Sequence, residues 1–330
     1  MQPMLAKAVS EIPLPDSVEG GLLYEPKWDG FRGIVTFDGD TVEIDSRGSK
    51  PLTRYFPELV AELRNQLTRP CVLDGEIIVR VGGRLDWEAL SQRIHPAQSR
   101  IDTLSVETPA SFVAFDLLDD PDLPFAERRV ALEKLDLAAP LHRSQVTTDV
   151  ELARRWLEEF EGAGLDGVVA KPLAAAYAPG KRVMLKIKHR RTADVVALGY
   201  RIHKSGAGVG SLLVGLYDRG ELKNVGGVSA FSDKRRLELV DELEPLVTRG
   251  DDGEAETGER ERNRFSSGRD TSFVRLRPER VLEVRYDQME GERFRHTAQF
   301  ERWREDREPE SCTYDQLEVP AAYDLAKVLA

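Results

Sequence analysis

Residues 25–32 read Glu25-Pro26-Lys27-Trp28-Asp29-Gly30-Phe31-Arg32, and Lys27 is the most informative position in the chain. A lysine amine is a nucleophile only when it is neutral, and a neighbouring carboxylate, guanidinium or metal ion sets how readily it loses its proton. Asp29 and Arg32 flank Lys27, and Gly30 would let a ligand phosphate approach the main chain closely. This stretch indicates a nucleophile that acts on nucleotides. The alternative is a surface lysine at a strand end, paired with a neighbouring acid.

The composition is that of a globular protein. With 330 residues, the chain is long enough for two domains that each bury a core. Apolar residues make up 41% and charged residues 32%, which argues against a disordered or fibrous protein. No apolar run approaches the roughly 20 residues of a membrane span. The first 19 residues lack the basic start and apolar block of a secretory signal, so we expect a cytoplasmic protein without a membrane partner.

Charge is distributed unevenly along the chain. The formal net charge of −11 argues against binding nucleic acid through overall basicity, and neither side of residue 190 is basic. Positive charge is concentrated between residues 181 and 191, which include no acid. A polyanion would therefore bind locally, although a solvated basic face would show the same pattern. The cations of this segment are Lys181, Arg182, Lys186, Lys188, Arg190 and Arg191.

The first part of the chain, residues 1–190, mixes strand-like and helix-like segments. Branched and aromatic residues or alternating patterns predict strands, and apolar residues at three- and four-residue spacing predict helices. Short connections between the strands favour antiparallel sheets with helices packed outside, hence an α+β domain. The expected strands are 41–46, 71–79, 111–117, 167–171 and 182–188, and the expected helices are 56–66, 124–134 and 150–161.

Residues 191–330 form the second predicted domain. Several short strands joined by glycine-rich turns, with one helix, are typical of a small closed barrel such as an OB-fold. The interval 249–270 is charged and poor in apolar residues, which predicts a mobile surface loop. The expected strands are 193–201, 211–218, 221–226, 280–288 and 293–300, and the expected helix is 233–246.

Two acids in the first domain share one local pattern. Glu76 and Asp166 each lie beside a glycine and a strand-like apolar run. Carboxylates presented in this way could bind Mg²⁺ or Mn²⁺ through oxygen, although Glu76 could equally be a hydrogen-bonded edge residue. Lys186 and Lys188 are two apart, so on a strand both ammonium groups point to one face. Two cations on one face repel each other unless an anion lies between them, which favours a phosphate site.

Phe115 is the aromatic candidate for base stacking. It lies in the apolar run Phe112-Val113-Ala114-Phe115-Asp116, where a core position is the default interpretation. It could instead form one wall of a pocket for a nucleotide base.

Taken in order, these segments resemble the ATP-dependent DNA ligases of the covalent nucleotidyltransferase superfamily. The nucleophile signature of that family is KxDGxR, and residues 27–32 match it fully. The short two-domain organisation is most similar to stand-alone bacterial ligases of the actinobacterial DNA ligase C type. Further collinear matches are Ser46-Arg47-Gly48, Asp74-Gly75-Glu76, Phe115-Asp116, Asp166-Gly167 with Lys171, and Leu185-Lys186-Ile187-Lys188.

The resemblance implies a reaction in three steps. Lys27 would attack the α-phosphate of ATP and form lysyl-AMP, the adenylate would pass to the 5′-phosphate of a nick in double-stranded DNA, and the 3′-hydroxyl would displace AMP. Such chemistry depends on charge neutralisation and in-line positioning. The resemblance assigns Glu25 and Phe115 to adenine, Arg32 and Arg47 to ribose and nick phosphate, Glu76 and Asp166 to ribose or divalent metal, and Arg182, Lys186 and Lys188 to the α-phosphate.

The sequence departs from the family pattern at two places. Asp166 stands where members usually have glutamate, so its metal contact would run through water. The final motif, RxDK, appears as Arg304-Glu305-Asp306-Arg307, which leaves Arg304 and Asp306 as expected nucleotide contacts and changes the last cation.

We expect a monomer associated with the nucleoid that acts in DNA repair, with a repair polymerase or Ku-like protein as a possible partner. One alternative keeps the chemistry and changes the substrate, giving an RNA ligase or a capping-type enzyme. A second alternative is an inactive nucleic-acid-binding OB protein.

Overall fold

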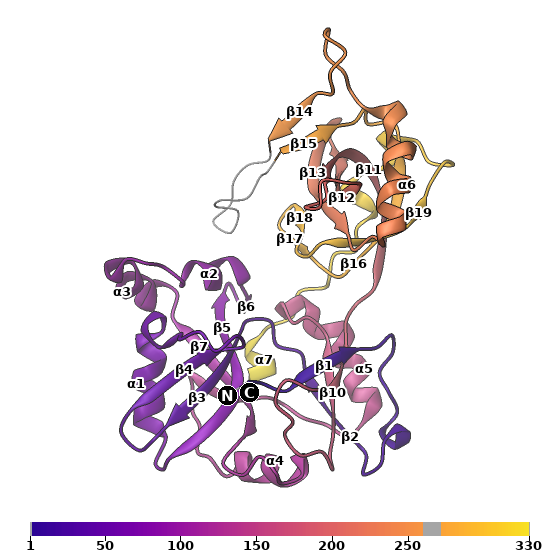
Figure 1. Cartoon of the computed structure of the whole chain (residues 1–330). Helices are drawn as coiled ribbons and strands as arrows, with labels where there is room; N and C mark the ends of the chain where they lie inside the picture. The colour runs from indigo at the N-terminus through magenta and orange to yellow at the C-terminus, as the bar shows by residue number, and fades with distance from the viewer. Residues whose placement is uncertain (1, 260–271, 330) are drawn as a thin grey trace. The chain divides into compact units, whose positions relative to one another are not determined.

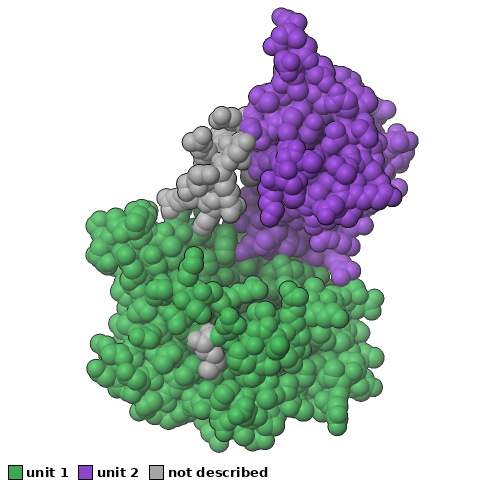
Figure 2. Space-filling model, viewed as in Figure 1, with its two compact units in different colours: residues 1–188, 320–330 green, residues 189–319 purple. Residues whose placement is uncertain are grey.

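The computed structural model describes residues 2–259 and 272–329, which fall into two compact units (Figure 1). The first unit comprises residues 1–188 together with 320–330, and the second comprises residues 189–319 (Figure 2). The division after Lys188 is two residues from the boundary expected at residue 190. The last eleven residues differ from expectation, because they belong to the first unit. Leu325 and Val328 explain this assignment, since both are fully buried in an apolar cluster of that unit.

Two sheets build the first unit. In the larger sheet the strand order is β4-β3-β5-β7-β8, with β6 added beside β5, and in the smaller sheet it is β1-β10-β9-β2. Most neighbours are antiparallel as predicted, but β7 pairs with β8 and β1 pairs with β10 in parallel, so both sheets are mixed. The strands are β1 (Leu5–Ala8), β2 (Leu22–Pro26), β3 (Phe31–Phe37), β4 (Val42–Ser46), β5 (Cys71–Val81), β6 (Arg84–Leu85), β7 (Ala110–Leu117), β8 (Leu141–Arg143), β9 (Val168–Pro172) and β10 (Arg182–Ile187).

Helices cover one face of the larger sheet. The helix α1 buries Leu59 and Leu63, which are four residues apart and therefore lie on one face. Both belong to the same apolar cluster as Phe112 of β7. The helix α5 starts after Asp149, whose side chain accepts a hydrogen bond from the backbone of Glu151. The helices of this unit are α1 (Pro57–Gln66), α2 (Trp87–Gln92), α3 (Gln98–Glu107), α4 (Phe125–Glu133), α5 (Val150–Glu159) and α7 (Ala326–Leu329).

The alternation along β7 decides where Phe115 lies. Phe112 and Ala114 belong to the cluster under the helices, whereas Val113 and Phe115 belong to a second cluster. This second cluster also includes Val168 of β9 and therefore joins the two sheets. Because successive strand residues point to opposite faces, Phe115 faces the smaller sheet.

The second unit contains a closed five-stranded barrel. Its strands pair in the order β11-β12-β13-β19-β16, and β16 returns to pair with β11. The small barrel expected from the sequence is therefore present. The elements of this unit are β11 (Arg191–Ile202), β12 (Val209–Asp218), β13 (Glu221–Ser229), α6 (Asp233–Leu243), β14 (Thr257–Glu259), β15 (Ser272–Arg275), β16 (Val281–Tyr286), β17 (Met289–Glu290), β18 (Arg293–Phe294) and β19 (Ala298–Trp303).

Several expected elements are wrong or were missed. The predicted loop 249–270 begins with ordered structure, because Arg249 bridges Ala255 and β14 pairs with β15. Residues 260–270 of that interval lie outside the described residues. The expected strand 293–300 is divided into β18 and β19. The strands β2 and β3, which flank the nucleophile stretch, were not expected from the sequence, because Pro26 and Gly30 interrupt the strand pattern there. No helix in the described ranges is long and apolar enough to cross a membrane.

Candidate active site

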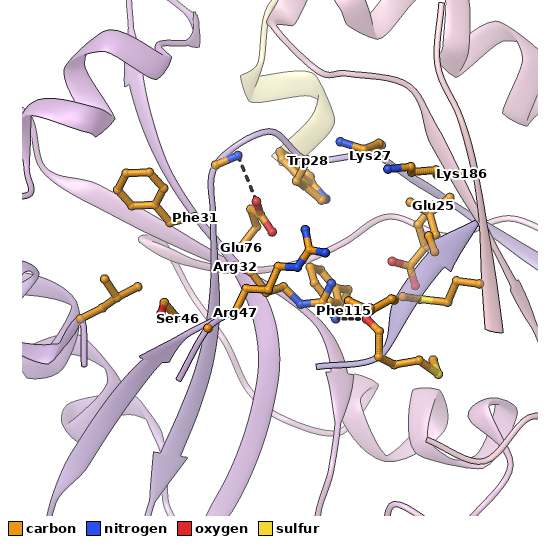
Figure 3. Close-up of a pocket in the computed structure, with 18 of the residues that line it drawn as sticks. Glu25, Lys27, Trp28, Phe31, Arg32, Ser46, Arg47, Glu76, Phe115 and Lys186 are labelled. Atoms are coloured by element: carbon orange, nitrogen blue, oxygen red, sulfur yellow. Dashed lines mark hydrogen bonds between the residues drawn. The ribbon is translucent and has the colours of Figure 1, made fainter. Parts of the chain in front are cut away.

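A cavity of about 800 Å³ in the first unit collects most of the predicted site residues (Figure 3). Strands of both sheets contribute to its lining, with β2, β9 and β10 from the smaller sheet and β3, β5 and β7 from the larger. The predicted residues that line it are Glu25, Lys27, Arg32, Arg47, Glu76, Phe115, Arg182 and Lys186. The two sheets therefore bring together side chains that are far apart in the sequence.

The position of Lys27 is fixed from both its backbone and its side chain. Its backbone N–H donates to the carbonyl of Gly167 over 2.8 Å, and its carbonyl accepts from the N–H of Asp166 over 3.0 Å. Its Nζ atom donates to Oδ2 of Asp166 over 2.5 Å. The Nζ atom of Lys188 lies 2.9 Å from the same oxygen. One oxygen of Asp166 therefore binds both Lys27, the nucleophile candidate, and Lys188. The Lys27 side chain remains 20% exposed.

Trp28 anchors the opposite side of this segment. Its indole N–H donates to Oγ of Ser144 over 3.0 Å, and both residues are buried. The tryptophan points into the apolar core of the first unit. Trp28 and its neighbour Lys27 both line the cavity.

Gly30 lines the cavity and also packs closely against β5. A Cβ atom at this position would lie 2.1 Å from the carbonyl oxygen of Ile77 on β5. The Gly30 N–H donates to Oε1 of Glu76 over 3.1 Å. Position 30 requires a glycine because β5 passes too close for any side chain. The backbone N–H of Gly30 binds the carboxylate of Glu76.

Glu76 is a carboxylate that titrates near neutral pH. Burial raises its pKa to about 7, although the charges of Arg32 and Lys27 act in the opposite direction. Within the described residues, no three histidine, cysteine or acidic side chains form a ready-made metal cluster. Glu76 and Asp166 each offer carboxylate oxygens, which are the ligands that Mg²⁺ accepts, and water or phosphate oxygens would have to complete the set. Each of the two residues therefore offers oxygen donors that such an ion accepts.

Arg32 is held flat against the aromatic wall of the cavity. Its guanidinium makes a bidentate pair with Asp74, whose carboxylate also accepts from the hydroxyl of Tyr177 over 2.6 Å. Burial alone would lower the pKa of Arg32, but Asp74 outweighs burial and raises it. The Cζ atom of Arg32 lies 4.6 Å from the centroid of the Phe115 ring. The sequence contains the Asp74-Gly75-Glu76 motif, but it carries no signal for Tyr177.

Positive charge accumulates on the side of the cavity formed by β10. The pKa of Lys186 is lowered, first by burial and then by repulsion from Lys27 and Lys188. Figure 3 shows Lys27 and Lys186 next to each other. Clustered cations of this kind are stabilised when an anion binds between them, so the arrangement suits a phosphate chain.

The remaining wall is apolar and aromatic. Phe115 is 8% exposed, and Met4, Val169 and Met184 line the same cavity. Glu25 is also part of this lining, 2.9 Å from the ammonium group of Lys171. A cavity with cations on one side and an aromatic face with a carboxylate on the other can accommodate a nucleotide. No pattern in the sequence connects Lys171 with Glu25.

Arg304 and Asp306 lie in the second unit and form a network there. Arg304 donates to both oxygens of Asp194 over 3.0 Å each and to both oxygens of Asp306 over 2.9 Å each. Arg307 lies 3.6 Å from Asp194 and donates to the carbonyl of Ser311 over 3.2 Å. The arginine that replaces the usual lysine is therefore bound within its own unit.

Comparisons with known proteins cover nearly the whole chain. Residues 3–188 match the family described as "ATP dependent DNA ligase domain", and residues 205–307 match "ATP dependent DNA ligase C terminal region". The chain is 53% identical to DNA ligase C of Mycobacterium tuberculosis, with 100% of this chain and 97% of that protein aligned. It is also 53% identical, with the same coverage, to DNA ligase C1 of Mycolicibacterium smegmatis.

More distant proteins share parts of this pattern. The multifunctional non-homologous end joining protein LigD of Mycobacterium bovis is 33% identical over 68% of this chain and 29% of that protein. A solved structure from a study of Lig E DNA ligases superposes with a TM-score of 0.60 at 18% identity, over 92% of this chain and 99% of that chain. At that identity, the structural likeness shows the fold alone.

Proposed function

Because this chain belongs to the ATP-dependent DNA ligase family, we propose that Lys27 is the nucleophile that becomes adenylylated in its reaction. The chain is an ATP-dependent DNA ligase, and what remains to be assigned is the role of each residue. The observation that carries the assignment is the position of Lys27 Nζ at the cavity, 2.5 Å from Asp166. Asp166 orients this nitrogen until the α-phosphate of ATP is within reach.

The first step forms a bond between Lys27 Nζ and the α-phosphorus. The bond from that phosphorus to the oxygen of the leaving pyrophosphate breaks, and the amine loses its proton. Arg182, Lys186 and Lys188 neutralise the phosphate oxygens during this transfer. Glu25 and Phe115 hold the adenine, and Arg32, packed on Phe115, is directed to the ribose.

Glu76 and Asp166 are the residues that we assign to a divalent cation, Mg²⁺ or Mn²⁺. Such an ion supplies positive charge to the phosphate oxygens when it is bound. The buried carboxylate of Glu76 also keeps the Gly30 backbone in place, and Asp166 keeps its hold on Lys27.

The later steps take place on nicked double-stranded DNA. The adenylate passes from Lys27 to the 5′-phosphate, the 3′-hydroxyl then attacks that phosphate, and AMP leaves. Arg47 is the candidate for contact with the nick phosphate, and Arg304 and Asp306 are candidates for contact with the ATP phosphates. The biological setting that we propose is DNA repair in the cytoplasm by a monomer at the nucleoid. The end-joining name of one relative supports this setting and a repair polymerase or Ku-like partner.

Covalent labelling tests the assignment of Lys27. The protein is first treated with pyrophosphate to remove any bound AMP and is then incubated with α-labelled ATP and Mg²⁺. The wild type and the exposed-site control Lys134→Ala should retain label through denaturation, and Lys27→Ala should not. Label on Lys27→Ala, or none on the folded wild type, would refute the assignment. Comparing the sealing of nicked DNA with that of nicked RNA distinguishes a DNA ligase from the RNA ligase alternative. Repeating the assay with NAD in place of ATP tests the nucleotide requirement.

A further inference from the structure

Lys171 and Glu25 form a buried ion pair at the base of the cavity. They lie on neighbouring strands, where Leu23 of β2 pairs with Lys171 of β9, so Glu25 is the diagonal neighbour of Lys171 on the same face. Their residues are 3% and 2% exposed, and the Nζ and Oε1 atoms are 2.9 Å apart. Both residues line the cavity. Burying an ion pair this deeply costs desolvation free energy, which close geometry and additional hydrogen bonds must offset.

The ammonium group of Lys171 is fixed from several sides. It donates to the carbonyl of Phe115 over 3.1 Å. It lies 4.6 Å from the centroid of the Phe115 ring and 4.8 Å from that of Phe125. Lys171 therefore binds the aromatic wall and the carboxylate of Glu25 at once, and it holds these two groups in a defined relation.

Glu25 retains capacity to accept a hydrogen bond. Its Oε1 atom lies 2.9 Å from the ammonium group of Lys171, and an ionised carboxylate has a second oxygen that can accept a hydrogen bond. In Figure 3 the carboxylate and Phe115 face the same cavity. A base stacked on Phe115 would thus present its edge to a carboxylate whose second oxygen can accept a hydrogen bond.

We propose that Lys171 is a positioning residue for base selection, which holds Glu25 in the orientation that accepts a hydrogen bond from the exocyclic amine of adenine. The inference rests on the proposed function, because it requires ATP to occupy this cavity. It adds to that function a residue that sets specificity without taking part in phosphoryl chemistry.

The charges around Glu25 support this role for Lys171. Burial raises the pKa of Glu25, and the charge of Lys171 is the largest influence that lowers it. Arg129 on α4 lowers it further, and Asp116 on β7 raises it. Asp116 is itself paired with Arg128 through two hydrogen bonds of 2.9 Å. Removing the charge of Lys171 would therefore raise the pKa of the buried carboxylate further.

The protonation state of Glu25 changes which bases it accepts. An ionised carboxylate only accepts hydrogen bonds, so it favours adenine over purine, which has no amine at that position. A protonated carboxyl can donate to the ring nitrogen N1, which both bases carry. Discrimination between ATP and purine riboside triphosphate should therefore fall when Glu25 is protonated. For the ionised group, the expected preference for ATP is about tenfold to a hundredfold, as for one hydrogen bond to a charged group.

The test measures lysyl-nucleotide formation with ATP and with purine riboside triphosphate between pH 6.5 and 9. The wild type should prefer ATP at every pH. Lys171→Met should lose most of this preference at pH 6.5 and regain it toward pH 9, as Glu25 ionises. Lys171→Arg should keep the preference because it keeps the charge. The double variant Glu25→Gln with Lys171→Met should show no pH-dependent preference. Lys134→Met, at an exposed lysine outside the cavity lining, should keep the preference of the wild type.

The outcomes separate the two hypotheses. If the wild type forms no adduct with ATP, the proposed function fails. If the adduct forms and Lys171→Met discriminates like the wild type, or loses activity equally with both nucleotides at every pH, only the role of Lys171 fails. Thermal melting identifies a variant that does not fold. Should Lys171→Met not fold, Glu25→Gln takes its place, and an unchanged preference for ATP in that variant would overturn the inference.

Discussion

At the scale of single residues, the carboxylate of Glu76 makes the stability of the protein depend on pH. Its pKa of about 7 in the folded protein is above its value of 4.5 without burial. Between these two values the folded state keeps a proton that the unfolded state releases, so the free energy of unfolding falls as pH rises through this window. The group therefore destabilises the ligand-free protein most above pH 7.

Glu76→Gln should remove this pH-dependent loss of stability. Glutamine preserves the acceptor for the Gly30 N–H and carries no charge. In EDTA, the variant should melt at a higher temperature than the wild type at pH 8, and the difference should shrink toward pH 5. The exposed Glu43→Gln serves as the control and should show no such trend. A melting temperature below that of the wild type at pH 8 would contradict the burial argument.

Asp194 holds the arginines of the second unit together. Its residue is 8% exposed and binds Arg304 at both oxygens, whereas the side chain of Asp306, which also binds Arg304 at both oxygens, is 67% exposed. Asp194→Asn should cost about 1.5–3 kcal/mol of unfolding free energy, as expected for lost hydrogen bonds to a charged group. Asp306→Asn should cost about 0–1 kcal/mol, because exposed pairs contribute little. Urea denaturation followed by fluorescence measures both, and equal losses would show that burial is irrelevant here.

At the scale of elements, β5 carries both Glu76, which lines the cavity, and Asp74, which pairs with Arg32. Asp74, Gly75 and Glu76 are consecutive on this strand, and a bulge between Asp74 and Gly75 shifts its register with β7. A Cβ atom at Gly75 would lie 2.3 Å from the ring of Phe112 and 2.5 Å from the carbonyl of Val113. The strand can approach β7 this closely only because residue 75 is glycine.

Gly75→Ala should therefore disturb β5, the strand that carries Glu76 and Asp74, the partner of Arg32. We expect a loss of about 1–3 kcal/mol in unfolding free energy, typical of overpacking. Gly48→Ala is the matched control, because a Cβ atom there would meet nothing within 4 Å. Chemical denaturation of both variants gives the comparison. A stable Gly75→Ala protein with unchanged adenylylation would show that β5 and β7 can separate freely.

The sheets explain how far the elements could be predicted. The strands β5, β7 and β10 carry long runs of branched and aromatic residues, so their positions follow from local pattern. The positions of β2 and β3 could not be predicted in this way, because Pro26 and Gly30 in the nucleophile segment interrupt the alternating pattern. The parallel pairs β1–β10 and β7–β8 depend on how distant segments meet, and no local pattern records that.

At the scale of the whole molecule, the chain enters the second unit after Lys188 and returns to the first at Pro320. The returning segment is tied to the first unit by its apolar residues and by hydrogen bonds. Leu325 donates its N–H to the carbonyl of Gly83 over 2.8 Å, and Gln145 donates to the carbonyl of Lys327 over 3.1 Å. The returning segment is therefore part of the core that supports the cavity.

Leu325→Ala should destabilise the first unit by about 2–5 kcal/mol, as for a fully buried leucine. The cluster that loses the side chain also contains Trp28 and Val168, which flank Lys27 and Asp166. Thermal melting and adenylylation at elevated temperature should both decline in this variant. Val319→Ala, at a residue that is 88% exposed, should change neither. A Leu325→Ala protein as stable as the wild type would mean that the segment is dispensable.

The sequence by itself determined the kind of chemistry, because short motifs preserve the spacing between Lys27, Asp29, Gly30 and Arg32 whatever the rest of the chain does. Only the tertiary structure decided which acid pairs with which cation. Asp166 meets Lys27 across 139 residues of sequence, and Lys171 meets Glu25 across the β2–β9 pair. It also decided that Glu76 titrates near neutral pH. Both the contacts and the pKa depend on burial and packing between distant segments, and these are properties of the folded chain.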